Sequence, residues 1–366
     1  MESKDILAIL PHFALDGRLV EIKELKSGNI NATYRLTFED AGIQRKYILQ
    51  RINTYVFREP GRMMENIVGV TEHLRGAMLK LGQNPERRVL RVIPTADGRL
   101  MHEDDTGCWR VYPFISNAFA YDTVDAASFL EVGRGFGRFQ RLLADYPAEQ
   151  LFESIPGFHN TERRNEQLTA AIQADEAGRA RDVRPEIDFL LQRKERLCGI
   201  VRLIETGELP LRVTHNDTKS NNVMLDKATG HALCVIDLDT VMPGSVLYDY
   251  GDAIRFGAST AVEDEPDTAK IALDMEKTEV FTRGFIEETN GFLRREELER
   301  LPLGIEVMTG ELAARFLADY LNGDRYFKIN APDHNLIRAR AQIALLRDVE
   351  SKRQQIQDMV NKLIGL

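Results

Sequence analysis

Apolar residues in the first part of the chain follow the two-residue period of β-strands. Between Leu19 and Arg51 they alternate with polar residues or form short β-rich runs, separated by the polar stretches SGNINA and EDAGIQ. Because successive side chains of a strand lie on opposite faces of a sheet, this pattern predicts an antiparallel meander. Residues 62–81 have the spacing of a helix. Further strands are predicted at three places: 89–95, 99–104 and 108–115.

The pattern changes after Pro113, where apolar residues recur at helical spacing over long segments. The clearest predicted helices are 124–146, 185–205 and 312–321. An island of strands lies within this helical part: 211–217, 222–226 and 231–239, with the turn KATG between the last two. The chain contains neither a repeat nor a Gly/Ser-rich linker. We therefore expect an α+β protein with two clamped lobes, residues 1–113 and 114–366.

Composition excludes several classes of function. A chain of 366 residues is long enough for two lobes, and a hydrophobic fraction of 43% is that of an ordinary globular protein. The net charge is −9 and no basic block is present, which argues against a nucleic-acid partner. No stretch approaches about 18 consecutive apolar residues, and the three cysteines lack metal-type spacing. These features predict a cytoplasmic monomer without a membrane partner.

Candidate chemistry is concentrated in two polar stretches of the strand island, VTHNDTKSNNVML and CVIDLDT. Phosphoryl transfer needs an acid that orients and deprotonates the attacking hydroxyl, together with hard oxygen ligands for Mg²⁺. Asp217 suits the first role, and Asn222 and Asp237 suit the second. Taken singly, each stretch is equally typical of a turn or of a solvated strand end.

The spacing of these residues resembles a known family. His215, Asp217 and Asn222 fit the pattern HxDxxxxN, and Asp237 with Asp239 fits the I-D-x-D that follows it in the aminoglycoside phosphotransferase and choline kinase superfamily. The resemblance implies a two-lobed, protein-kinase-like fold. It also implies ATP and Mg²⁺ as cofactors.

Two further stretches gain a meaning from this resemblance. The loop from Ser27 to Thr33 resembles the loop that covers the nucleotide phosphates, with Ser27, Gly28 and Asn31 close to them; without the family it reads as a hairpin loop. The stretch RVYPFI resembles the hinge between the lobes. Tyr112 and Phe114 would then line the adenine pocket.

One position departs from the family pattern. The third strand normally carries a lysine that contacts the phosphates, whereas this chain has Gln50, flanked by Lys46 and Arg51. Gln50 is expected to bind nucleotide through a neutral hydrogen bond. Which group neutralises the phosphates stays open at this point, and so does a second possibility, a kinase-like protein that binds nucleotide without catalysis.

The resemblance extends along almost the whole chain to the N-acetylhexosamine 1-kinases, through stretches such as INATY, DYGDAIRFGAST and RFLADYLNGDRYF. It implies an ATP-dependent kinase that phosphorylates the anomeric hydroxyl of N-acetylgalactosamine or N-acetylglucosamine. The implied sugar-binding residues are Asn29, Asp217, Asp239, Thr240, Arg315 and Tyr326.

Alternatives remain for both the residues and the substrate. Arg315 has the spacing to pair with Asp319 on one helix, and Tyr326 could be a core residue. A kinase of the same fold could act on homoserine, an amino alcohol or an aminoglycoside. The last of these would call for an acidic acceptor pocket.

Overall fold

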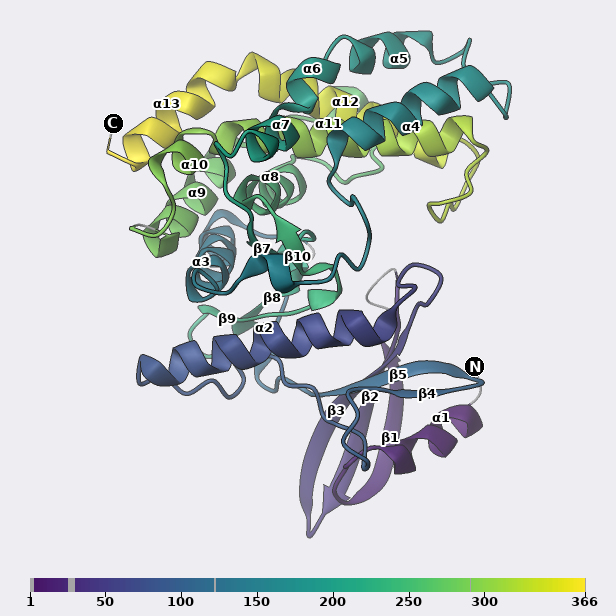
Figure 1. The fold of residues 1–366 in the computed structure, drawn as a ribbon, viewed down its shortest axis with the longest axis vertical. Coiled ribbons are helices and arrows are strands. Elements are labelled where there is room, and N and C mark those ends of the chain that lie inside the picture. The colour runs from purple at the N-terminus through teal and green to yellow at the C-terminus, as the bar shows by residue number, and fades with distance from the viewer. Residues whose placement is uncertain (1–2, 26–29, 122, 290, 366) are drawn as a thin grey trace.

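The computed structural model describes residues 3–25, 30–121, 123–289 and 291–365. An antiparallel sheet forms one end of the molecule and helices form the other, so the α+β prediction is confirmed (Figure 1). The strand order of the sheet is β1-β2-β3-β5-β4. Its strands are β1 (Arg18–Leu25), β2 (Ala32–Asp40), β3 (Ile43–Ile52), β4 (His102–Asp104) and β5 (Gly107–Pro113).

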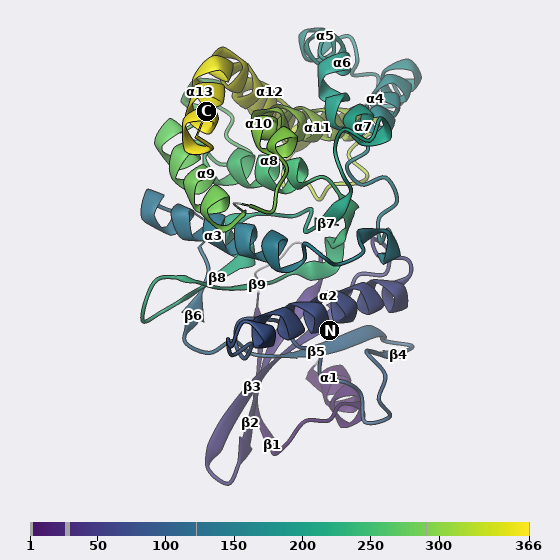
Figure 2. The same cartoon turned by 60° about the vertical axis from the view of Figure 1, so that its left-hand side comes forward.

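The predicted meander corresponds to β1, β2 and β3, which pair in antiparallel register. Buried side chains of this sheet, including Leu36, Leu49 and Trp109, form a core with helix α1 (Ser3–Ile9) and the 3₁₀ turn η1 (Leu10–His12). Helix α2 (Pro60–Lys80) lies between the sheet and the rest of the chain (Figures 1 and 2). In this position α2 connects the sheet with the C-terminal part, which contains the polar loops.

The strand predicted over residues 89–95 is wrong. The segment forms only isolated bridges, Ile93 to Val111 and Thr95 to Phe13, among the described residues. Pro94 has no N–H to give to a ladder, and the N–H of Thr95 turns back to the carbonyl of Arg99 at 2.8 Å. The apolar spacing therefore correctly indicated that the segment is partly buried, but the segment does not pair as a strand.

Helices dominate the C-terminal part, as predicted. They are α3 (Ala126–Leu142), α4 (Thr161–Ala174), α5 (Arg184–Leu191), α6 (Lys194–Leu197), α7 (Gly199–Glu205), α8 (Val246–Gly257), α9 (Met275–Thr289), α10 (Arg295–Glu299), α11 (Leu301–Leu321), α12 (His334–Ser351) and α13 (Arg353–Leu363), with the 3₁₀ turns η2 (Ala148–Gln150), η3 (Ser220–Asn222), η4 (Leu238–Thr240) and η5 (Thr268–Lys270). The segment 185–205 is not one helix but α5, α6 and α7. An i→i−3 bond from Arg193 N to Leu190 O tightens the chain there, and Gly199 adds a residue of low helix propensity.

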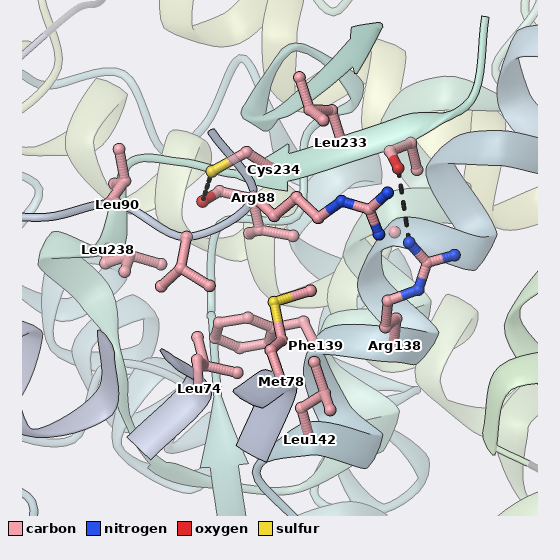
Figure 3. Close-up of a pocket in the computed structure, with 14 residues that line it drawn as sticks. Leu74, Met78, Arg88, Leu90, Arg138, Phe139, Leu142, Leu233, Cys234 and Leu238 are labelled. Carbon is pink, nitrogen blue, oxygen red and sulfur yellow. Dashed lines mark hydrogen bonds between the residues drawn. The ribbon is translucent and has the colours of Figure 1, made fainter. Parts of the chain in front are cut away.

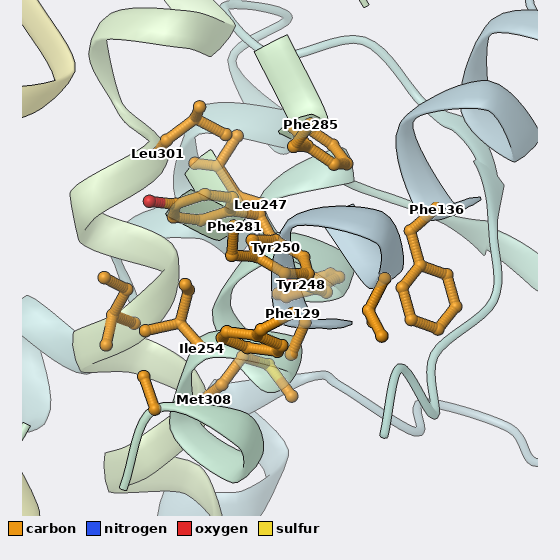
Figure 4. Packing of buried hydrophobic residues seen from close by; sticks show 14 of the residues in the cluster. Phe129, Phe136, Leu247, Tyr248, Tyr250, Ile254, Phe281, Phe285, Leu301 and Met308 are labelled. Carbon is orange, nitrogen blue, oxygen red and sulfur yellow. The ribbon is translucent and has the colours of Figure 1, made fainter. Parts of the chain in front are cut away.

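Large apolar side chains from α3, α8, α9 and α11 form the core of this part (Figure 4). Helices α8 and α11 cross at Gly251 and Gly304, where a Cβ on Gly251 would lie 2.2 Å from the Gly304 oxygen. Glycine is needed at this crossing because a side chain would push the helices apart. No described helix has the length and apolar character that crossing a bilayer requires.

Short strands within the helical part hold the polar loops. They are β6 (Ala118–Phe119), β7 (Arg212–Thr214), β8 (Val223–Asp226), β9 (Ala232–Val235) and β10 (Met242–Gly244), arranged as β6-β8-β9 and β10-β7. The turn from β8 to β9 is the predicted KATG turn, closed by a bond from Gly230 N to Asp226 O at 2.8 Å. The predicted strand island is therefore present, and its strand ends carry the candidate residues.

Candidate active site

Asp217 lies in the loop after β7 and is held by neighbours on both carboxylate oxygens. Lys219 Nζ lies 2.8 Å from Oδ1, and Asn222 Nδ2 donates to Oδ2 at 3.2 Å and to the main-chain oxygen at 2.8 Å. Burial lowers the pKa of Lys219, but the charge of Asp217 outweighs this and raises it above its ordinary value. The carboxylate is therefore oriented through both of its oxygens and still partly exposed to solvent.

The loop that carries Asp217 is anchored to the buried Asp249 of α8. Oδ2 of Asp249 accepts from His215 N at 2.9 Å and Oδ1 accepts from Asn216 N at 2.8 Å, while Gln140 Nε2 donates to Oδ2 at 2.6 Å. Burial raises the pKa of Asp249 in spite of these donors. Asn216 is in the left-handed region with φ 64°, a conformation that asparagine tolerates better than most residues.

His215 supports this loop from inside. Its Nε2 bonds the carbonyl oxygen of Ile236 at 2.9 Å, and its Nδ1 accepts from Asp217 N at 3.3 Å. The rings of Phe136 and Phe139 contact the imidazole edge to face. These contacts give His215 a structural role in the loop, with the two phenylalanine rings packed against it.

Asp237 and Asn222 lie next to each other. Ile236 N donates to Asn222 O at 2.9 Å, and Asp237 has a left-handed backbone with φ 62°. Solvent reaches the Asp237 carboxylate, yet burial by the surrounding protein, followed by the charges of Asp239 and Asp217, raises its pKa to about 6. In the described part of the chain it has no ion pair.

These residues fit Mg²⁺. The amide nitrogen of Asn222 is used toward Asp217, which leaves the amide oxygen for a cation, and the unpaired carboxylate of Asp237 is a hard oxygen donor. The described residues contain no cluster of three or more His, Cys, Asp or Glu suited to a metal. That is compatible with Mg²⁺, which commonly takes one or two protein ligands and completes its shell with phosphate oxygens and water.

Asp239 is buried and is held by donors from the N-terminal sheet. Arg110 Nη1 lies 2.5 Å from Oδ1 and Nη2 3.0 Å from Oδ2, and Asn31 Nδ2 donates to Oδ2 at 2.7 Å. The neighbouring Thr240 is also buried, and its Oγ1 donates to His215 O at 2.7 Å. The structure thus brings Asp239 and Thr240 to the same loops as Asp217.

Of the predicted nucleotide residues, Gln50 lies on β3 and Tyr112 on β5, while Asn31 and Phe114 lie directly beside β2 and β5. Ser27 and Gly28, and the predicted sugar residue Asn29, are outside the described residues. Gln50 Nε2 donates to Thr33 Oγ1 at 3.1 Å, and its Oε1 accepts from Arg110. Tyr112 is buried on β5, where Arg110 lies over its ring. The N–H of Phe114 already donates to Lys46 O at 2.9 Å, so this backbone donor is not free for an adenine.

Arg315 and Tyr326 both lie beside Phe327, and Arg315 is linked through other side chains to the loop that carries Asp217. Arg315 Nη1 lies 3.4 Å from Oε1 of the buried Glu311, whose carboxylate meets His159 Nδ1 at 3.1 Å. His159 Nε2 lies 3.3 Å from the carbonyl oxygen of Asn216, directly before Asp217. A short chain of contacts therefore joins Arg315 to the catalytic loop.

Both simpler explanations for these two residues are wrong. Arg315 pairs with Glu311 one turn before it, because the Asp319 carboxylate already accepts from the backbone N–H groups of 325, 326 and 327. Tyr326 is 56% exposed and is not a core residue. Arg164 approaches the same place, and burial together with the charge of Arg315 lowers its pKa.

A narrow cavity between α2, α3 and β9 is separate from this site (Figure 3). Leu74, Met78, Phe139 and Leu142 supply much of its lining, so it belongs to apolar packing. Burial raises the pKa of the Cys234 thiol in its wall to about 12, which keeps the thiol protonated and unreactive.

Sequence reasoning missed several residues that shape the site: Arg110, Asp249, His159 and Arg164. For two of them, the surrounding sequence contains a feature that could have revealed the role. Arg110 is a charge inside the apolar run CWRVYPF, and Asp249 is an acid in the largely apolar helix that follows the second polar stretch. Charged residues in buried elements need partners, so both positions pointed to a buried ion pair or hydrogen-bond network.

Comparison with known proteins agrees with this geometry. Residues 21–281 match the model of the phosphotransferase enzyme family known as APH. The chain therefore belongs to this family and is a small-molecule phosphotransferase.

Solved structures share the fold at low sequence identity. An aminoglycoside phosphotransferase from Alicyclobacillus acidocaldarius is 13% identical, with 96% of each chain covered and a TM-score of 0.62. A choline kinase from Cryptosporidium parvum is 11% identical, with 100% of each chain covered and a TM-score of 0.61. A spectinomycin phosphotransferase in complex with ADP and spectinomycin is 14% identical, covering 94% of this chain and 98% of its own, with a TM-score of 0.54.

Proposed function

We propose that this phosphotransferase transfers the γ-phosphoryl group of ATP to the anomeric hydroxyl of an N-acetylhexosamine. The resemblance in sequence to the N-acetylhexosamine 1-kinases motivates the substrate. The complex of the spectinomycin enzyme with ADP supports a nucleotide donor.

The main support for a sugar acceptor is the charge of the residues that we expect to bind it. Arg315 and Arg164 are close enough for the charge of Arg315 to lower the pKa of Arg164, and the buried Glu311 carboxylate that interacts with both is also shared with His159. Arg164 donates to Phe158 O at 2.7 Å and has no carboxylate partner among the described residues. Two guanidinium groups at this place disfavour a cationic acceptor there, which supports a neutral sugar over choline, ethanolamine or an aminoglycoside.

Each residue then has a defined task. Asp217 accepts the proton of the attacking hydroxyl, with Lys219 and Asn222 fixing its orientation. Asn222 and Asp237 would hold Mg²⁺, which would supply neutralising charge for the phosphates. Arg315 and Tyr326, with donors that match sugar oxygens, hold the acceptor on the far side of Asp217.

An acceptor panel tests the proposal. The protein is incubated with MgATP and, separately, N-acetylgalactosamine, N-acetylglucosamine, their methyl glycosides, homoserine, choline and spectinomycin, and products are identified by mass and NMR. We expect 1-phosphates of the two free sugars only, because a methyl glycoside has no anomeric hydroxyl. Phosphorylation of a methyl glycoside or of choline at a comparable rate would overturn the assignment.

A pair of variants tests the acceptor side. Arg315→Ala should raise the KM for the sugar at least tenfold while changing the KM for ATP less than threefold. Arg340→Ala is the control, since Arg340 makes a similar helix-surface ion pair, with Glu186, away from the site. A defect of Arg315→Ala confined to ATP would remove Arg315 from acceptor binding.

A further inference from the structure

The glutamine on the third strand faces an arginine on the neighbouring strand. Gln50 and Arg110 are paired in the register of β3 and β5. Gln50 Oε1 accepts from two nitrogens of the guanidinium, Nε at 3.0 Å and Nη2 at 2.8 Å. The neutral amide therefore acts as an acceptor that orients a cation.

The other edge of the same guanidinium crosses to the C-terminal part. It makes a two-point contact with Asp239, and the Arg110 side chain is only 1% exposed. Burial lowers the pKa of Arg110, but the charge of Asp239 raises it above its ordinary value. Asn31 adds a third donor to Asp239 and is itself held by Asn53 N at 3.0 Å.

This geometry explains why position 50 is not a lysine. An ammonium there would face the Arg110 guanidinium at hydrogen-bonding distance with no carboxylate between them, and such like-charge contacts inside a protein are unfavourable. An uncharged acceptor is compatible with Arg110, and glutamine has the length to reach both nitrogens. Gln50 and Arg110 are thus hydrogen-bonded partners on neighbouring strands. The positive charge that the family pattern has on β3 is carried by β5 in this chain.

We propose that Arg110 is a positioning residue for phosphoryl transfer: oriented by Gln50, it fixes Asp239 and holds the sheet over the acid cluster formed by Asp217, Asp237 and Asp239. Both carboxylate oxygens of Asp239 are engaged by the sheet, so its main task is to anchor the two parts of the chain. The inference rests on the phosphotransferase activity of the family and not on the identity of the acceptor.

An exchange of the two residues tests this. Arg110→Gln should lower kcat at least 100-fold, whereas the KM for ATP should change less than tenfold, because the Arg110 guanidinium is buried and is engaged by Gln50 and Asp239. Gln50→Lys combined with Arg110→Gln returns a cation to the same strand pair and should recover at least tenfold in kcat. Arg35→Gln is the matched control: Arg35 is an ion-paired arginine on β2 of the same sheet, and its loss should leave kcat unchanged.

Two further variants keep the test informative if Arg110→Gln does not fold. Arg110→Lys retains the charge but loses the two-point contact with Asp239. Gln50→Ala retains the ion pair, but the Arg110 guanidinium is no longer oriented by a side chain on β3. Each variant should lower kcat about five- to fiftyfold with a near-normal KM for ATP. All assays use the acceptor that gives the highest turnover in the panel, so a different acceptor does not affect the result. A kcat within threefold of wild type for Arg110→Lys and Gln50→Ala, or an exchange variant no better than Arg110→Gln, would refute the proposal.

Discussion

Asp249 offers a sharp test of how the catalytic loop is held, because it lies outside the two polar stretches that mark the site in the sequence. Its carboxylate accepts from the backbone N–H groups of His215 and Asn216 and from the side chain of Gln140. Asp249→Asn changes one acceptor oxygen into a donor of the same size. The amide can serve only one of the two backbone groups, and the other then faces an NH₂ group in a buried site.

The expected cost follows from these contacts. A buried donor left without an acceptor costs about 1–3 kcal/mol, and the remaining bonds lose the assistance of the negative charge. Burial raises the pKa of Asp249, so the neutral asparagine also removes an unfavourable charge and recovers part of this cost. We expect a net loss of about 1–3 kcal/mol in the free energy of unfolding.

The effect on catalysis should be larger than this loss suggests. Asn216 directly precedes Asp217, so a shift of its backbone moves the base, and a displacement of about 1 Å can cost on the order of 100-fold in rate. Urea unfolding gives the stability and steady-state kinetics give kcat, with the exposed Asp105→Asn as a control that should change neither. If Asp249→Asn unfolds within 0.5 kcal/mol of wild type and keeps kcat within about threefold, the anchoring role is wrong.

Three other predictions concern the acids and the helix packing. Asp217→Asn should lower kcat by about 10²–10⁴ while MgADP binding measured by calorimetry stays within threefold; a near-normal kcat would remove Asp217 as the base. Because burial raises the pKa of Asp237 to about 6, protons compete with Mg²⁺ below that pH, and the half-saturating Mg²⁺ concentration should rise about tenfold per pH unit there and stay level above pH 7. A half-saturating Mg²⁺ concentration that stays constant from pH 5 to 7 would contradict this prediction. Gly251→Ala should destabilise the protein by at least about 1–3 kcal/mol in urea unfolding, whereas Gly76→Ala, in open space on α2, should stabilise it by about 0.5–1 kcal/mol; equal signs would disprove the packing argument.

The catalytic loop could be predicted from the sequence because its residues are close together along the chain. Asp217 and Asn222 are separated by one turn, and a single β-hairpin separates them from Asp237. Local spacing and the return to apolar strands were sufficient to place them at neighbouring strand ends. The meander of β1, β2 and β3 was predictable for the same reason, since hairpin strands pair with their neighbours in sequence.

Contacts between distant segments could not be predicted in this way. Arg110 and Asp239 are separated by 129 positions, and their pairing depends on how the sheet packs on the C-terminal part. The contact between His159 and Asn216 also joins segments that no local pattern connects. The failure at 89–95 has a different cause: apolar spacing reports burial, whereas pairing also needs free N–H groups, which Pro94 cannot supply.

The three acids of the site differ in how their charge is balanced, and this difference distinguishes their tasks. Asp217 has an ammonium on one oxygen and an amide on the other, and solvent still reaches it. Asp239 is covered by the guanidinium of Arg110 and is fixed as an anchor. Asp237 makes no ion pair in the described part of the chain, and burial, followed by the charges of Asp239 and Asp217, raises its pKa. A divalent cation would relieve the unbalanced charge most at Asp237, so the charge balance supports the metal position independently of motif spacing.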